Sequence, residues 1–335
     1  MRILVTGGAG YVGSVSVEKF LDAGHDVTVM DDLSTGHRSA VPGEASLETI
    51  SYGDREAVMA VLEKHAIEAV LHCAAKSLVG ESMDDPAKYY RENVVGGVAL
   101  LEAMRAVGVR RVVFSSTAAT YGMPERTPIL ETDPVRPINT YGETKRTVEG
   151  AIRWYGHAYG FRSVILRYFN VAGATKAHGE CHRPETHLIP NVLAAAEADR
   201  ELTLYGDDYA TPDGTCVRDY IHAEDLASAH LLALHATAPD DPRTGPAAGA
   251  TEPLICNLGN GTGFSNRQIV AAAEAVVGKP IRIAMGPRRA GDPPVLVASS
   301  ARATEVLRWR AAHDSIEEII DTAWNWRCEN PAGYP

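Results

Sequence analysis

Tyr141 and Lys145 are the two residues of this chain whose types and spacing most directly suggest chemistry. They form a Tyr-x-x-x-Lys pattern at the start of a stretch with helical apolar periodicity, and a separation of four residues places both side chains on one face of a helix. A tyrosine hydroxyl has an unperturbed pKa of about 10 and is a poor base at neutral pH. A nearby ammonium group favours the phenolate, so Tyr141 is predicted to take a proton from a hydroxyl group.

Thr117 is a third candidate for the same chemistry. The run Phe114-Ser115-Ser116-Thr117 closes an apolar stretch that reads as a strand, and ligands bind at the carboxyl ends of the strands in open α/β sheets. The Thr117 hydroxyl is therefore expected to hydrogen-bond the reacting oxygen beside Tyr141. The alternative is local capping of backbone groups, which strand-end Ser and Thr residues often perform.

A glycine-rich loop precedes the first predicted helix. Its glycines, Gly7, Gly10 and Gly13, form a G-x-x-G-x-x-G pattern directly after the strand Ile3-Leu4-Val5. Glycine permits a tight turn and lets the backbone approach a pyrophosphate closely, and a helix N-terminus offers free N–H groups and a positive dipole end. In this strand–loop–helix context the pattern predicts dinucleotide binding.

Two acidic residues follow the second predicted strand. Asp31 stands 18 residues after Gly13 and is followed by Asp32. A carboxylate at this position accepts hydrogen bonds from the adenosine ribose and repels a 2′-phosphate, so NAD is favoured over NADP. Ordinary turn carboxylates are the alternative. An oxidised nicotinamide ring would add a second positive charge that favours the Tyr141 phenolate.

Strands and helices that alternate along the first half of the chain must position these residues. Buried-strand patterns and helical periodicity predict a parallel sheet with helices on both faces, a doubly wound α/β fold of the Rossmann type. The predicted strands are 3–5, 27–30, 69–72, 111–116 and 163–168, and the predicted helices are 12–21, 55–65, 86–107 and 141–159.

The amino-acid composition of the sequence changes after Asn170. The segment 173–185 is rich in Gly, His and charge, and segments 205–215 and 236–253 are rich in Pro, Asp and Gly, which is typical of loops. Short helices are predicted at 188–198, 224–235, 266–277 and 315–325. We therefore expect an NAD-binding domain over residues 1–170, rejoined by segments near 218–236 and 254–259, and a smaller, irregular substrate domain over 171–335.

Bulk composition excludes several classes of protein. The 335 residues are 45% hydrophobic and 22% charged, enough for a substantial core, and the formal charge of −11 argues against a nucleic-acid or anionic-membrane surface. The five cysteines are scattered and never spaced as C-x-x-C, which argues against a disulfide framework or a structural zinc site, and no metal site is predicted. Without a signal-peptide or membrane-spanning apolar run, a cytoplasmic enzyme is expected.

Several motifs taken together resemble the extended short-chain dehydrogenase/reductase superfamily and, within it, the family of UDP-glucose 4-epimerases. The superfamily motifs are Thr6–Gly13, Phe114–Gly122, Tyr141–Lys145 and Arg167–Asn170. The narrower resemblance is carried by His72 with Val79–Ser82, by Gly206–Tyr209, by Gly214–His222 and by Arg288–Asp292. The resemblance covers about residues 1 to 310 and implies NAD-dependent interconversion of UDP-glucose and UDP-galactose, through oxidation at C4 and hydride return to the opposite face.

The resemblance also implies roles for individual residues. Tyr141 would be the base, Lys145 would bind the nicotinamide ribose and Thr117 would contact the 4-hydroxyl. The NAD site would include Gly7, Gly10, Tyr11, Val12, Gly13, Asp31, Asp32, Asp54, Asn93 and Phe169, besides Tyr141 and Lys145. The nucleotide-sugar site would include Asn170, His187, Leu188, Thr203, Tyr205, Arg218, Arg289 and Asp292. The resemblance further implies a homodimer, built through long helices such as 86–107 and 141–159.

Some positions depart from the family pattern and leave alternatives open. Thr117 stands where serine is usual, His187 where asparagine is common, and Leu296 where the family has a residue that gates hexose size. A UDP-pentose (UDP-xylose/UDP-arabinose) or a UDP-N-acetylhexosamine therefore remains an alternative substrate. A dehydratase is rejected because Ala118 and Ala119 follow Thr117, where that class needs an acid or base. A non-catalytic NAD-sensing regulator is the alternative from another class, although such proteins commonly lose the Tyr/Lys pair.

Overall fold

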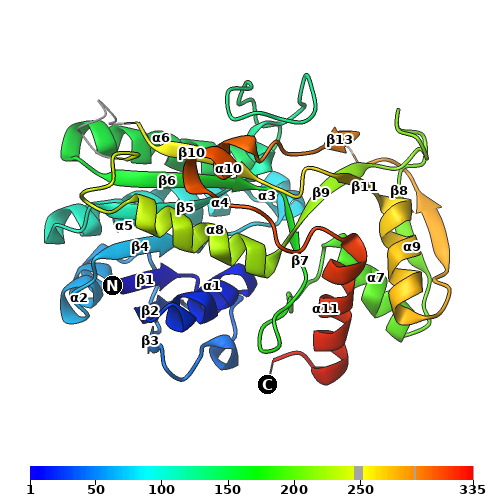
Figure 1. The fold of residues 1–335 in the computed structure, drawn as a ribbon, viewed down its shortest axis with the longest axis horizontal. Coiled ribbons are helices and arrows are strands. Elements are labelled where there is room, and N and C mark those ends of the chain that lie inside the picture. Colours follow the sequence, from blue (N-terminus) through cyan, green and yellow to red (C-terminus); the bar gives the residue numbers. More distant parts are fainter. Residues whose placement is uncertain (245–251, 290–291, 335) are drawn as a thin grey trace.

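A seven-stranded parallel sheet forms the centre of the protein, with strand order β10-β6-β5-β4-β1-β2-β3. The computed structural model describes residues 1–244, 252–289 and 292–334 (Figure 1). The strands are β1 (Arg2–Thr6), β2 (Asp26–Met30), β3 (Ser46–Glu48), β4 (Ala69–His72), β5 (Arg111–Thr117), β6 (Arg162–Tyr168) and β10 (Leu254–Leu258). The predicted Rossmann-type doubly wound sheet is thereby confirmed.

Helices cover both faces of this sheet because its strands are apolar on both sides. In β1, Ile3 and Val5 join the core under α1 and α8, whereas Leu4 between them joins the core under α2, α5 and α6, as the alternation of side chains along a strand requires. These helices are α1 (Tyr11–Asp22), α2 (Arg55–Lys64), α5 (Gly96–Val107), α6 (Thr140–Tyr159) and α8 (Ala223–Ala236).

The predicted single helix over 86–107 is wrong in its middle part. Helix α4 (Pro86–Tyr89) is followed by a π-helical turn, η2 (Tyr90–Val95), before α5 begins at Gly96. The wider turn contains Asn93, whose amide hydrogen-bonds both backbone groups of Lys76 and the hydroxyl of Thr144. Long-range contacts of this kind stabilise π turns, which often occur at functional sites, and no helical period in the sequence reveals them.

The remaining elements build a smaller unit beside the sheet (Figure 1). It contains a sheet of β7 (Asn170–Ala172), β9 (Val217–His222), β11 (Gly263–Ser265) and β13 (Val295–Leu296), and the pair β8 (Leu202–Tyr205) and β12 (Ile283–Gly286). Its helices α7 (Leu188–Glu197), α9 (Asn266–Val277) and α11 (Ile316–Glu329) share a third core. Within the chain, α8 and β10 return to the parallel sheet, and the domain division at residue 170 stays a prediction.

Short helical segments connect these parts. They are η1 (Arg38–Ala40), α3 (Val79–Asp84), η3 (Ala118–Thr120) and α10 (Ala301–Leu307). Part of the predicted loop 236–253 lies outside the described residues. Among the helices that the structure describes, none combines the length and the apolar character needed to cross a bilayer.

A buried ion pair fastens α6 to the sheet. Arg167 on β6 holds the Glu149 carboxylate with two hydrogen bonds, of 2.9 and 2.5 Å, and Glu149 also accepts a 2.6 Å bond from Ser116. Both side chains of the pair are less than a tenth exposed. Removing one member of such a pair leaves the other charge buried without compensation, which is strongly destabilising.

Glu149→Gln is therefore expected to lower the free energy of unfolding by about 3 kcal/mol, measured by urea denaturation followed by circular dichroism. Glu143→Gln on the same helix is the matched control, because the Glu143–Arg146 pair is exposed and its loss costs less than about 1 kcal/mol. Equal effects of the two substitutions would contradict the structural importance assigned to Glu149.

Candidate active site

The structure brings Tyr141 and Thr117 together where α6 begins beside the end of β5, and Lys145 follows one turn later on the same helix. The side chain of Asn139 caps α6 by accepting a 2.8 Å hydrogen bond from the Gly142 amide, which satisfies one of the free N–H groups of the first turn. The Tyr141 amide donates to the Ser82 hydroxyl at 3.1 Å. Tyr141 is thus fixed by its neighbours in the helix and by α3.

The amino group of Lys145 is held by the backbone of β5. Its Nζ donates a 2.8 Å hydrogen bond to the Ser115 carbonyl and lies 4.7 Å from the centre of the Phe114 ring. Lys145 is buried, and burial lowers the pKa of its amine to about 8, because a charged group loses hydration in the interior. The ammonium expected beside the phenol is therefore anchored to the strand that carries Thr117.

Burial also determines the proton affinity of the phenol. It raises the pKa of Tyr141 to about 12, while a hydrogen bond with Thr117 acts in the opposite direction. Thr117 itself accepts a 3.1 Å hydrogen bond from the Ala119 amide. The Thr117 hydroxyl therefore caps the turn η3 and also reaches Tyr141, while its contact with a reacting oxygen stays a prediction. In the protein alone Tyr141 is a neutral phenol at pH 7.

Gly142 allows this close approach of α6 to the end of β5. A Cβ atom at Gly142 would lie 2.4 Å from the carbonyl oxygen of Ala119, and a backbone atom cannot move aside as a flexible side chain can. Any other residue at this position must push the first turn of α6 away from η3. The small residue next to Tyr141 is therefore a requirement of packing.

Gly142→Ala is expected to lower the free energy of unfolding by about 1–3 kcal/mol through overpacking. Gly150→Ala on the same helix is the control, because a Cβ there has no neighbour within 4 Å and should raise stability by about 0.5–1 kcal/mol through helix propensity. Denaturation midpoints of the two variants test this, and a stabilised Gly142→Ala protein would show that the contact is not tight.

The glycine loop and the start of α1 have the form predicted for a phosphate site. Gly7 has a φ of +73° and no room for a Cβ beside Ala74, and a Cβ at Gly13 would lie 2.0 Å from the Gly7 oxygen. Helix α1 begins after Gly10, without a side-chain cap and without an acidic residue in its first turn, which includes Tyr11 and Val12. Its first N–H groups therefore remain available to an anion.

The Asp31 carboxylate ties this loop to the end of β2. It accepts hydrogen bonds from the amides of Ala9 at 3.0 Å and Leu33 at 2.9 Å. Burial raises the pKa of Asp31, although both hydrogen bonds favour the charged form. Each carboxylate oxygen has a second lone pair, so Asp31 retains the acceptor capacity that its predicted contact with a ribose requires.

The other predicted cofactor residues differ in what they can offer. Asp32 accepts from the Ser34 amide at 2.9 Å, and Asp54 is an exposed cap of α2. The Asn93 amide is occupied by Lys76 and Thr144, so within the protein it acts as a positioning group. Phe169 is buried against Ala118 and Tyr121, directly behind the strand end of Thr117.

Four of the predicted nucleotide-sugar residues form two close pairs in the smaller unit. Arg218 on β9 donates a 2.6 Å hydrogen bond to Asp292, and the Arg289 guanidinium lies 4.4 Å from the centre of the Tyr205 ring. Two of the residues in the predicted motif Arg288–Asp292, Ala290 and Gly291, lie outside the described residues.

The other four predicted nucleotide-sugar residues occupy the ends and faces of nearby elements. His187 directly precedes α7 without a capping bond from its side chain, and Leu188 is the first residue of that helix. Asn170 begins β7 and pairs with Tyr220, and Thr203 is exposed on β8. Binding of a nucleotide sugar by all eight residues stays a prediction.

Sequence reasoning missed the residues that hold the site together. Ser82 and Ser115 contact Tyr141 and Lys145 only through the fold. Glu149 carries a signal that was available, because it follows Lys145 by four residues and Tyr141 by eight, which places it on the same face of α6. A carboxylate on an inward face predicts a buried cationic partner.

Known proteins resemble this chain over its whole length. A family model described as the NAD dependent epimerase/dehydratase family matches residues 3–244. A UDP-glucose 4-epimerase from Lacticaseibacillus casei is 48% identical over 100% of this chain and 99% of the relative. The solved UDP-glucose 4-epimerase from Brucella ovis, in complex with NAD, is 45% identical over 97% of each chain, with a TM-score of 0.89. That from Bifidobacterium longum, in complex with NAD⁺ and UDP, is 32% identical over 100% of each chain, with a TM-score of 0.91.

Proposed function

The chain belongs to the NAD dependent epimerase/dehydratase family, and from this membership and the site geometry we infer that it is an NAD-dependent UDP-hexose 4-epimerase. It interconverts UDP-glucose and UDP-galactose, an isomerisation without net redox change. The observation that carries this inference is the buried group of Tyr141, Thr117 and Lys145 at the carboxyl end of the parallel sheet.

The residues present fit NAD. The free N–H groups at the start of α1 suit a pyrophosphate, and Asp31 suits a ribose with free hydroxyls. When bound, NAD supplies a reversible hydride acceptor and a positive charge near the phenol. A capping side chain or an acidic residue in the first turn of α1 would oppose binding of a pyrophosphate. The described segment at the start of α1 contains neither of these features.

The residues of the chain handle the proton. Tyr141 is positioned to accept the proton of the 4-hydroxyl and to return it, and Thr117 holds the same oxygen by a hydrogen bond. Burial keeps water out, so that the phenol exchanges its proton with the substrate. With a pKa of about 8, Lys145 keeps most of its positive charge at pH 7, and this charge favours the phenolate once the proton has left.

The smaller unit supplies the groups that would hold the UDP part of the substrate. Arginine suits a diphosphate because its planar group donates two parallel hydrogen bonds, and Arg218 and Arg289 are the candidates. Leu296 packs against the cluster that contains Ala118, close to the strand end of Thr117, and is proposed to limit the size of the sugar. UDP-pentoses and UDP-N-acetylhexosamines are the alternative substrates.

A panel of UDP-sugars, assayed for 4-epimer formation without added cofactor, tests this function. UDP-glucose and UDP-galactose are expected to interconvert, and Tyr141→Phe is expected to lower turnover about 100-fold or more while NAD stays bound. Tyr155→Phe is the matched control, since this phenol lies on the same helix and bonds Glu102 instead; it should remain active. If no epimer forms from any UDP-sugar although NAD binds, a non-catalytic NAD sensor is the better description.

A homodimer is proposed from the outer surface of the helices beside the site. Val95 on η2 is 64% exposed and Trp154 on α6 is 61% exposed, although both are large and apolar, and such patches mark interfaces. We also propose a cytoplasmic location, because all five cysteines are free thiols, as a reducing compartment favours.

Sedimentation velocity is expected to show a dimer that Val95→Glu converts largely to monomer, because a carboxylate at the centre of an apolar interface is costly to bury. Met123→Glu is the control, since Met123 is also exposed but lies outside these helices. A monomeric wild-type protein would rule out the proposed dimer.

A further inference from the structure

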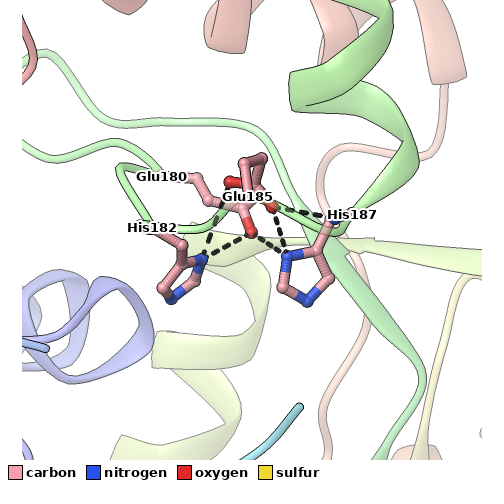
Figure 2. Close-up of side chains that lie close together, drawn as sticks. All are labelled: Glu180, His182, Glu185 and His187. Atoms are coloured by element: carbon pink, nitrogen blue, oxygen red, sulfur yellow. Dashed lines mark hydrogen bonds and ion pairs between the residues drawn. The ribbon is translucent and has the colours of Figure 1, made fainter. Parts of the chain in front are cut away.

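A cluster of two histidines and two glutamates lies between β7 and α7, outside the catalytic group. Glu180, His182, Glu185 and His187 come from one short segment and are here called the His–Glu cluster (Figure 2). One potential ligand atom from each residue lies within 4.8 Å of the other three. None of these residues takes part in the proton handling assigned to Tyr141.

Both imidazoles turn the same nitrogen toward the carboxylates (Figure 2). The Nδ1 atoms of His182 and His187 lie 3.1 and 2.7 Å from Oε1 of Glu180. Glu185 approaches the same two nitrogens at 3.8 and 2.8 Å, and its Oε1 also accepts hydrogen bonds from the amides of Thr186 and His187. The four potential ligand atoms therefore lie close together, and two backbone amides hold the Glu185 carboxylate in place.

The two carboxylates need a compensating charge of +2 because they lie close together with little exposure. The side chain of Glu180 is 8% exposed and that of Glu185 is 20% exposed. Burial opposes the charge, but the neighbouring histidines lower the pKa of Glu180 to about 2, and the glutamates raise the pKa of His187 to about 10 against the effect of its burial. Protons on the imidazoles provide one form of compensation, and a divalent cation provides another.

We propose that the His–Glu cluster binds one divalent transition-metal ion with the preferences of Zn²⁺. Zinc accepts imidazole nitrogen and carboxylate oxygen at about 2.0–2.2 Å in a tetrahedron, whose ligand atoms then lie about 3.4 Å apart. The contacts from the two Nδ1 atoms to Oε1 of Glu180 are 2.7 and 3.1 Å, and those to Oε1 and Oε2 of Glu185 are 2.8 and 3.8 Å, so these nitrogen–oxygen distances lie around that value. Mg²⁺ and Ca²⁺ are disfavoured because they prefer a shell of oxygen ligands.

A second group of His222, Glu224 and His313 lacks the free nitrogen that a metal needs. Nδ1 of His222 accepts the Glu224 amide at 3.1 Å, and Nε2 lies 3.0 Å from the Thr322 hydroxyl. Metal binding there would break the cap of α8 or the bond to α11. In the His–Glu cluster the two Nδ1 atoms meet only carboxylates, so metal binding through these nitrogens breaks no bond between a histidine ring and the backbone.

The position of the cluster gives the ion a structural role. Tyr11 at the start of α1 donates a 2.5 Å hydrogen bond to the Gly173 carbonyl, at the beginning of the same segment, and its ring lies edge-on to His182 at 6.4 Å. His187, at the other end, directly precedes α7 and is itself one of the predicted nucleotide-sugar residues. A bound ion would fix the segment between the dinucleotide loop and the predicted nucleotide-sugar residues.

Binding to the protonated cluster is an exchange of ions. Each Nδ1–H bond that is present in the metal-free cluster breaks as a metal–nitrogen bond forms, and its proton passes to the buffer. No group is oxidised or reduced. The number of protons released therefore reports on the ligands directly and does not depend on enzymatic activity.

Zinc content and proton release test the proposal on the full chain. The protein is freed of metal with a chelator, equilibrated at micromolar free Zn²⁺ and assayed by mass spectrometry. One zinc per chain is expected, with release of protons from the imidazoles that the ion binds. His182→Gln and Glu180→Gln should each weaken binding at least about tenfold, since even groups that merely orient metal ligands contribute this much.

His313→Gln and Cys181→Ser are the controls, and both should retain the zinc. The first removes a member of the second group, and the second removes the thiol that lies between two cluster residues. The proposal is overturned if the wild-type chain takes up no zinc, if the cluster variants bind as well as the wild type, or if a control loses the ion. If both cluster variants fail to fold, the test passes to the wild-type chain. Proton release and the visible spectrum of bound Co²⁺ must then indicate imidazole ligands, and their absence would overturn the proposal.

Discussion

Helix α6 lies so close to the carboxyl end of β5 that a methyl group at Gly142 would collide with the Ala119 carbonyl. The same contact places Tyr141 within reach of Thr117 and lets Lys145 bind the backbone of β5. Further along the helix, Glu149 fixes α6 to the neighbouring strand. Catalytic geometry and helix packing are therefore one constraint, and a change that loosens the packing also separates the reacting groups.

Burial of the catalytic groups away from water is the second consequence of this packing. Burial acts on both ionisable groups of the site in the direction of the neutral form, since it raises the pKa of Tyr141 to about 12 and lowers that of Lys145 to about 8. A buried phenol gives up its proton only when a charge arrives with the ligands. The site is thus inert by itself, which suits an enzyme that must oxidise and reduce one carbon without releasing its intermediate.

The features predicted from the sequence are those that local residue patterns encode. The strand–glycine–helix start of the chain and the Tyr141–Lys145 spacing can be recognised from residues that are close in sequence. The Rossmann-type sheet was predicted because strand and helix patterns alternate along the first half of the chain. The π turn around Asn93 and the pairing of Glu149 with Arg167 depend on residues that are distant in sequence. Periodicity carries no information on such contacts, so one helix was predicted where the structure has three segments.

The segment between β7 and α7 shows how local composition and tertiary structure complement each other. Its histidines and charges are visible in the sequence, but a segment rich in Gly, His and charge is typical of a loop, and no metal site was predicted there. Folding places one end of the segment on Tyr11 and the other at the start of α7. A loop that connects two binding regions must hold a defined shape without a hydrophobic core of its own. Charged groups that converge on one point, compensated by protons or by an ion, supply that rigidity where apolar packing is absent.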